Sequence, residues 1–194
     1  MAGDYAALYS GKIELGYNKV RYINHPYWHT DKFYKGIIGY NGCIYSNILL
    51  RYDTYKGVLV TISPQKRYIL QVDMRKVSFF IINEQKFIPQ GDGFVALLYK
   101  GENLCLTQHV TSVMGTPIRK GKSYYNQFYT PIRFSLYKEG TVYEVNSYSD
   151  LLRVFPMHKK QLKSYCQKEN LSFKKNNEMQ SMIQLVKYAD SLIY

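Results

Sequence analysis

The chain has no long apolar run, and this absence excludes proteins that span a membrane with helices. Its longest apolar blocks have the length of a strand, whereas a helix that spans a bilayer needs about 18 to 20 apolar residues in succession. The segment from Met1 to Leu8 has neither a basic stretch nor an apolar core, so we expect no secretory signal peptide in this sequence. We therefore predict a protein without a transmembrane segment.

Cysteine and catalytic motifs are also scarce. Cys43, Cys105 and Cys166 are odd in number and include no CxxC pair, so at most one disulfide could form, and we expect all three to be reduced. No HExxH helix or GxSxG elbow is present. Gly121-Lys122-Ser123 has the ending of a phosphate-binding loop, but the required first glycine is replaced by Thr116. These absences favour a non-enzymatic protein, and no cofactor is expected.

Acidic residues are few compared with basic ones. The chain has 26 lysines and arginines against 14 aspartates and glutamates, which gives a formal net charge of +12. Both the first part of the chain, residues 1–146, and the last part, residues 147–194, are basic. Such a charge favours acidic partners, for example nucleic acid, anionic glycans or lipid headgroups.

Tyrosine is abundant, and its pattern indicates a β-sheet. There are 21 tyrosines, and a ring with a hydroxyl suits a pleated surface where the ring packs and the hydroxyl stays in water. From about residue 33 to 146 the side chains alternate with a period of two between turn signals, as in an antiparallel sheet. Asn41-Gly42 fits a type I′ turn, and further turns are expected at Ser63 to Lys66, Gly101 to Asn103 and Lys138 to Gly140. The predicted hairpins are Phe33–Tyr40 with Cys43–Tyr52, Val58–Ile62 with Tyr68–Val72, Phe94–Tyr99 with Leu104–Val110, and Ile132–Tyr137 with Thr141–Val145.

After the last predicted strand, the spacing of apolar residues changes to that of a helix. Ser147 precedes Asp150 by three residues, as in an N-terminal cap, and Pro156 ends this first short helix. A second helix is predicted over Met157 to Glu169 and a third over Asn177 to Ile193. The third helix has one apolar stripe that needs a partner, formed by Met179, Met182, Ile183, Val186, Ala189 and Ile193.

These patterns predict a single α+β domain over residues 1–194, with a β-rich part (1–146) and a helical part (147–194). The β-rich part is expected to be a mainly antiparallel sheet of about 8 to 10 strands, either a meander or a partly closed barrel. Two to three C-terminal helices should pack on its apolar face. The loop from Val113 to Ser123, which contains glycine and proline, is expected to be the most mobile one.

Several short motifs lie before and within the predicted sheet: His25-Pro26-Tyr27, Phe33 with Gly36, Tyr45-x-Asn47, Leu50-Arg51-Tyr52-Asp53-x-Tyr55 and Phe79. With Ser149 to Leu152 and the basic tail from Lys159 to Lys175, they resemble a family of uncharacterised exported proteins of Bacteroidetes. In that family a small residue precedes the Pro-Tyr pair, and His25 departs from this pattern. The resemblance implies a periplasmic or cell-envelope protein whose leader has been removed, and it supplies no catalytic residues.

Two groups of candidate site residues overlap before the first strand. Tyr27, Trp28 and His29 could form an aromatic platform on which sugars or peptide side chains stack. His25, His29 and Asp31 are residue types that bind metals, although the proline after His25 disfavours the helix that would align the two histidines. A polar connection into the first strand, with Asp31 in solvent, explains the same residues without a metal.

The C-terminal helices carry lysines that could bind anions. A solvated helix face explains these lysines as well as phosphate binding does, and no known RNA- or DNA-binding motif is present. The candidates are Lys159, Lys160, Lys163, Lys174 and Lys175.

We therefore predict a non-enzymatic exported module, binding or structural, that meets an unknown protein, peptide or glycan through a tyrosine-rich sheet surface. It could associate peripherally with the envelope. One alternative is a metal-dependent or other hydrolase that uses His25, His29 and Asp31. A second alternative is nucleic-acid binding through the basic C-terminal helices. An aromatic surface patch, a concave polar site and a continuous basic stripe would distinguish the three.

Overall fold

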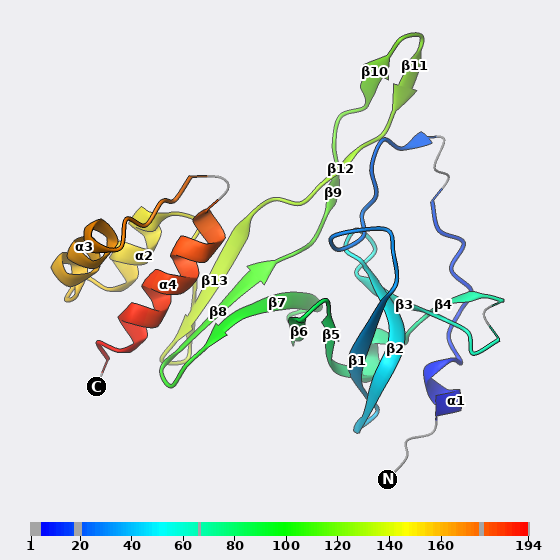
Figure 1. The fold of residues 1–194 in the computed structure, drawn as a ribbon, viewed down its shortest axis with the longest axis horizontal. Coiled ribbons are helices and arrows are strands. Elements are labelled where there is room, and N and C mark those ends of the chain that lie inside the picture. Colours follow the sequence, from blue (N-terminus) through cyan, green and yellow to red (C-terminus); the bar gives the residue numbers. More distant parts are fainter. Residues whose placement is uncertain (1–4, 18–20, 66, 175–176, 194) are drawn as a thin grey trace. The chain divides into compact units, whose positions relative to one another are not determined.

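The computed structural model describes residues 5–17, 21–65, 67–174 and 177–193 (Figure 1). The chain divides into two compact units. Unit 1 contains Met1–Val95 and Val110–Pro131, and unit 2 contains Ala96–His109 and Ile132–Tyr194. The last predicted hairpin belongs to the unit that holds the C-terminal helices.

A ten-stranded antiparallel sheet is the main element of the fold, which confirms the predicted α+β class. The strand order is β14-β13-β8-β7-β6-β5-β1-β2-β3-β4. Because this order is linear, the sheet is open and not closed on itself. The strands are β1 (Tyr34–Tyr40), β2 (Cys43–Asp53), β3 (Val58–Ile62), β4 (Ile69–Gln71), β5 (Val77–Ile82), β6 (Gln85–Gln90), β7 (Gly93–Lys100), β8 (Leu104–His109), β13 (Arg133–Lys138) and β14 (Thr141–Glu144).

The four predicted hairpins are all present as neighbouring strands. Asn41 and Gly42 have φ values of 50° and 78°, and Tyr40 pairs with Cys43 on either side of them. Both central residues of a type I′ turn need positive φ, which Asn and Gly adopt at low cost. Of the predicted turn residues, Lys66 lies outside the described part of the chain.

The β5–β6 hairpin is one of the strand pairs that were not predicted. Its turn consists of Asn83 and Glu84, with φ values of 48° and 65°, between the paired residues Ile82 and Gln85. Asparagine accepts positive φ readily, but glutamate is uncommon there, so this pair is a weaker turn signal than Asn41-Gly42.

The core of unit 1 is built from aromatic rings on neighbouring strands. Phe80 of β5 and Phe87 of β6 are directly opposite each other, and their rings stack with centroids 4.6 Å apart. The buried Tyr52 of β2 packs against both rings. The strands approach closely at Gly36 of β1, where a Cβ atom would lie 2.4 Å from the carbonyl oxygen of Ile81.

The segment before the first strand covers the edge of β4. The amide of Gln71 donates to the carbonyl of Lys12, and the amide of Glu14 donates to the carbonyl of Ile69, both at 2.8 Å. Ile13 forms an isolated antiparallel bridge with Leu70. The segment that leads to the cavity described below therefore starts from a fixed position on the sheet.

Residues 113–129 of unit 1 form a two-stranded arm (Figure 1). This 113–129 arm contains two short ladders, in contrast to the predicted mobile loop over Val113 to Ser123. Parts of the predicted loop are therefore strands, and its mobility stays a prediction. Its strands are β9 (Val113–Met114), which pairs with β12 (Phe128–Tyr129), and β10 (Ile118–Lys120), which pairs with β11 (Ser123–Tyr125).

Unit 2 contains the three predicted C-terminal helices. Ser147 caps the first of them, because its Oγ accepts a hydrogen bond from the Asp150 amide at 3.1 Å and donates to the Asp150 carboxylate at 2.7 Å. This confirms the predicted cap. The helices are α2 (Tyr148–Val154), α3 (Lys159–Lys168) and α4 (Glu178–Asp190); unit 1 has the short helices α1 (Tyr5–Leu8) and η2 (Met74–Lys76).

Helix α4 packs its apolar side on the sheet of unit 2, as predicted. Met182, Val186 and Ala189 are buried in one cluster with residues of β8 and β13. Met179 is 45% exposed and does not belong to this contact, whereas Leu185 is fully buried. The buried face is therefore rotated slightly from the predicted stripe.

The sequence predicted no transmembrane helix and no disulfide. Among the residues that the structure describes, none of the helices has the length and apolar character needed to cross a membrane. Cys43, Cys105 and Cys166 are free and partly buried in the structure.

Candidate ligand-binding cavity

A cavity of about 440 Å³ lies within unit 1, beside β2. Its volume falls in the range of about 300 to 1,000 Å³ that is typical of small-molecule sites. The apolar and aromatic part of its lining comes mostly from the segment before the first strand and includes Leu15, Tyr17, Tyr22, Ile23 and Tyr27. The polar part consists of Asn24, His25, Asp31 and Arg51.

Arg51 is the cation of this cavity. Its neighbours Leu50 and Tyr52 in β2 are buried, so Arg51 points to the opposite face of the strand. There the guanidinium lies between the rings of Tyr27 and Phe33, with its Cζ 3.9 Å and 4.4 Å from the two centroids. Stacking on aromatic faces holds the plane of a guanidinium and leaves its edge available for hydrogen bonds.

The hydrogen-bonding capacity of Arg51 is mostly unused within the described part of the chain. Its Nη1 donates to the carbonyl oxygen of Asp31 at 2.8 Å, and its Nε is buried without a partner. The ion pairs of the described residues do not include Arg51. A guanidinium has five N–H donors, and no carboxylate of the described residues forms an ion pair with that of Arg51.

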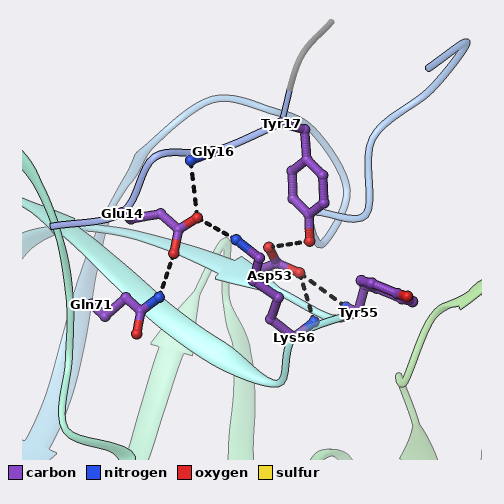
Figure 2. Close-up of polar contacts among 7 residues, drawn as sticks. All are labelled: Glu14, Gly16, Tyr17, Asp53, Tyr55, Lys56 and Gln71. Atoms are coloured by element: carbon purple, nitrogen blue, oxygen red, sulfur yellow. Dashed lines mark hydrogen bonds and ion pairs between the residues drawn. The ribbon is translucent and has the colours of Figure 1, made fainter. Parts of the chain in front are cut away.

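Asp53 lies on the same face of β2 as Arg51. It is hydrogen-bonded to Tyr17, which lines the cavity (Figure 2). Its side chain is buried with 1% exposure. One oxygen, Oδ2, accepts a hydrogen bond from the Tyr17 hydroxyl at 2.8 Å. The other, Oδ1, accepts from the amides of Tyr55 at 3.0 Å and Lys56 at 2.9 Å. Asp53 therefore orders the turn after β2 and also positions Tyr17 in the lining.

A second buried carboxylate, Glu14, fixes the start of the same segment (Figure 2). It accepts a hydrogen bond from the Gly16 amide at 3.0 Å and a further one from the side-chain amide of Gln71. Its other contact is an ion pair with the ammonium group of Lys56. Lys56 thus connects the two carboxylates, through its backbone amide to Asp53 and its side chain to Glu14.

The two carboxylates have opposite shifts in pKa. Burial raises the pKa of Asp53, and the hydrogen bonds from Lys56 and Tyr17 offset this only partly. Burial also raises the pKa of Glu14, but the hydrogen bonds from Lys56 and Gln71 outweigh it, and the net pKa is lowered. Burial and the neighbouring Asp53 raise the pKa of the Tyr17 hydroxyl, so this group remains a protonated donor.

The structure brings together two of the three predicted metal-type residues. His25 and Asp31 line the cavity, whereas His29 is not part of its lining. His29 has a φ of 60°, and its ring packs edge-on against Trp28 at 5.0 Å. Among the described residues, no group of three or more His, Cys, Asp or Glu side chains is placed to hold a metal ion.

The predicted platform of Tyr27, Trp28 and His29 is not one surface. Trp28 packs edge-on against Phe87 at 5.2 Å, and its amide donates to the carbonyl of Tyr52 at 2.9 Å. Its indole Nε1 is buried without a partner in the described part of the chain. Trp28 therefore belongs to the packing of unit 1, while Tyr27 faces the cavity and stacks on His25 at 5.8 Å.

The strongly exposed tyrosines do not gather on one sheet face. Of those that the structure describes, Tyr137 and Tyr143 lie in the ten-stranded sheet. Tyr143 is opposite the buried Leu136, and Tyr137 is opposite Val142, so the two rings point to opposite faces. The others lie in α1, in turns and in the 113–129 arm, and they are Tyr5, Tyr55, Tyr68, Tyr124 and Tyr129.

The predicted anion-binding lysines are on the surface of unit 2. Lys159, Lys160 and Lys163 are exposed on α3, and Lys174 is exposed in the connection to α4. Lys175 lies outside the described residues.

Sequence reasoning missed the lining residues Arg51 and Tyr17, and it missed Asp53, which positions Tyr17. Arg51 and Asp53 were treated as parts of a structural motif, although two charged residues on one face of a strand rich in tyrosine were a usable signal. Tyr17 carried no signal, because its partner Asp53 is 36 positions away. No family model, no curated protein and no solved structure matches this chain.

Proposed function

We propose that the protein is a non-enzymatic binding protein that holds a small organic acid in the cavity of unit 1. The observation that carries this proposal is the guanidinium of Arg51, which lines the cavity, is stacked between two rings and is bonded to no described carboxylate. A carboxylate or phosphate group of a ligand is the acceptor that suits an arginine best, because it can receive two parallel N–H bonds.

The remaining lining indicates the rest of the ligand. Tyr17, Tyr22 and Tyr27 provide ring surfaces, and Leu15 and Ile23 provide aliphatic surface. An acid that carries an aromatic ring or another flat apolar group would be in contact with these walls while its anionic end meets Arg51. Asp31 also lines the cavity, so the site carries charges of both signs and suits a singly charged ligand better than a polyanion.

The proposed binding site is the cavity of unit 1, whereas the sequence predicted the surface of the sheet. The ligand would contact the tyrosines that line this cavity, and not a flat tyrosine-rich surface of the sheet. A glycan or a peptide with an acidic group remains within the proposed ligand class. From the resemblance of its motifs, we also propose that the protein is exported and acts in the periplasm or at the cell envelope.

Calorimetric titration of the full chain tests the cavity. Benzoate and phenyl phosphate serve as ligands, and benzamide serves as a neutral compound of similar shape. We expect the two acids to bind and benzamide to bind at least about tenfold more weakly, since a hydrogen bond to a charged group contributes about 1.5 to 3 kcal/mol. Equal binding of acid and amide would contradict the proposed role of charge.

Variants of Arg51, with a variant of Arg67 as the control, test whether the ligand binds at Arg51. Arg51→Gln should lose the preference for acids, and Arg51→Lys should keep part of it, because lysine retains the charge but not the fork of donors. Arg67→Gln removes an exposed arginine of the same unit and should bind as the original protein does. Circular dichroism confirms folding of each variant. If Arg67→Gln also lost binding, the affinity would depend on the net charge of the protein and not on Arg51.

A further inference from the structure

We infer that the 113–129 arm binds single-stranded nucleic acid. Its tip carries the exposed residues Arg119, Lys120 and Lys122 within four positions. The sequence has no aspartate or glutamate between Glu102 and Glu139, and the ion pairs of the described residues include none of the three cations at the tip. Cations that form no ion pair with a carboxylate are available to neutralise phosphates.

The arm combines these cations with an exposed ring on one face. Arg119 of β10 is directly opposite Tyr124 of β11, so their side chains lie on the same face of the hairpin. Tyr124 is 70% exposed. The Nε of Arg119 donates to the carbonyl of Gly121 at 3.0 Å, which holds the guanidinium near the turn. A base could stack on Tyr124 while the adjacent phosphates meet the three cations.

The base of the arm is fixed to the rest of unit 1. The amide of Gly115 donates to the carbonyl of Gln127 at 2.9 Å, and the Gln127 side chain donates to the carbonyl of Thr116 at 3.1 Å. On the other side, Asn126 exchanges backbone hydrogen bonds with Arg21 at 2.9 Å and Ile23 at 3.1 Å. The exposed ring and cations are therefore presented on a braced hairpin, which lowers the entropic cost of binding.

The order of residues along the arm favours nucleic acid over a lipid surface. A hairpin that inserts into a bilayer needs apolar residues at its tip and cations behind them. Here the tip is Lys120-Gly121-Lys122, and the exposed ring of Tyr124 follows it. The cations would meet a polyanion first, and the ring is placed beside them as a stacking surface.

The C-terminal lysines lack this combination. Lys159, Lys160 and Lys163 form an equally basic surface on α3. However, the nearby Tyr165 is stacked on Tyr188, with centroids 4.0 Å apart and planes 8° from parallel. Its ring face is therefore occupied within unit 2. This helix supplies a matched control of the same charge without an accessible ring.

Fluorescence anisotropy of the full chain with labelled oligouridylate and oligothymidylate of about 12 nucleotides tests the inference. If three phosphates are neutralised, the affinity should fall about 20-fold between roughly 50 and 200 mM salt. The combined variant Arg119→Gln, Lys120→Gln and Lys122→Gln should lose most of this dependence. Tyr124→Ala should weaken binding about fivefold or more, while Tyr124→Phe, which keeps the ring, should bind as before.

The control is the combined variant Lys159→Gln, Lys160→Gln and Lys163→Gln, which removes the same charge from α3 and should bind nearly as the original protein does. Both triple variants change exposed residues, and circular dichroism verifies their folding. Equal loss in both triples, unchanged binding in the arm variant, or no binding at the lowest salt would overturn the inference. Stronger binding to phosphatidylglycerol vesicles than to the oligonucleotides would also overturn it and would assign the arm to lipid.

Discussion

The side-chain amide of Asn24 bonds to both backbone groups of Phe128, 104 positions away in the sequence. Its Nδ2 donates to the Phe128 carbonyl at 2.6 Å, and its Oδ1 accepts from the Phe128 amide at 2.8 Å. Asn24→Ala should lower the free energy of unfolding by about 1 to 2 kcal/mol, because both bonds are lost. Urea unfolding measures this effect. Asn126→Ala serves as the control, since Asn126 contributes backbone bonds here, and an equal loss in both variants would contradict the assignment.

The lowered pKa of Glu14 predicts a loss of stability in acid. A carboxyl whose folded pKa lies below its ordinary value of 4.5 stabilises the protein above that pH and loses this contribution as the pH falls through the folded value. Glu14→Gln removes the titrating group. Its unfolding free energy, measured by urea titration from neutral pH downwards, should therefore fall less steeply than that of the original protein. A steeper fall would disprove the assigned role of the ion pair with Lys56.

The raised pKa of Asp53 predicts the opposite dependence of stability on pH. Its folded pKa is raised above 3.8 by burial, so the folded state takes up a proton before the unfolded state does as the pH falls. This protonation adds stability towards acid, and Asp53→Asn removes the gain. The variant should thus lose more stability on acidification than the original protein, in contrast to Glu14→Gln. Parallel curves for the two variants would show that these carboxylates do not differ in environment.

Asp190 at the end of α4 should be important for unit 2. Its carboxylate accepts hydrogen bonds from the Tyr99 hydroxyl at 2.7 Å and from the amides of Glu102 at 3.2 Å and Asn103 at 3.0 Å. A negative charge at a helix C-terminus is unfavourable, so these bonds explain its presence. Asp190→Ala should cost about 3 kcal/mol and Tyr99→Phe about 1 kcal/mol. Hydrogen exchange at residues 102 and 103 should rise in the first variant and change little in the second.

Gly36 should not tolerate a side chain. A Cβ atom there would lie 2.4 Å from the backbone carbonyl of Ile81, which cannot move without displacing β5. Gly36→Ala should destabilise the protein by about 2 to 3 kcal/mol. Gly93→Ala is the matched control, because no atom lies within 4 Å of the added methyl group, and its effect should stay within about 0.5 kcal/mol. Thermal unfolding followed by circular dichroism compares the two.

Local signals in the sequence were sufficient for most of the fold. Asn41-Gly42 predicted its hairpin because both residues accept positive φ, and Ser147 predicted its helix start because its hydroxyl caps the Asp150 amide. The turn at Asn83-Glu84 was missed because glutamate rarely adopts the positive φ that it has there. A turn or helix start can thus be predicted from the sequence when its residues themselves prefer the backbone conformation that the structure shows.

The cavity could not be predicted, because its geometry depends on distant parts of the chain. Arg51 becomes a preorganised cation when Tyr27 and Phe33 lie on either side of its guanidinium. The sequence shows the three residues but not their stacking. The predicted histidines illustrate the same limit, since His25 lies at the cavity while His29, four positions later, turns away with positive φ.

The pairing of Lys12 and Glu14 with the outer side of β4 affects how readily the protein can aggregate at high concentration. An uncovered strand edge offers free amides and carbonyls to other molecules and can start the growth of fibrils. At β4 the amide of Gln71 and the carbonyl of Ile69 are already engaged by the same chain. Aggregation through this edge would first require the N-terminal segment to detach from β4, so its attachment protects this edge from pairing with other molecules.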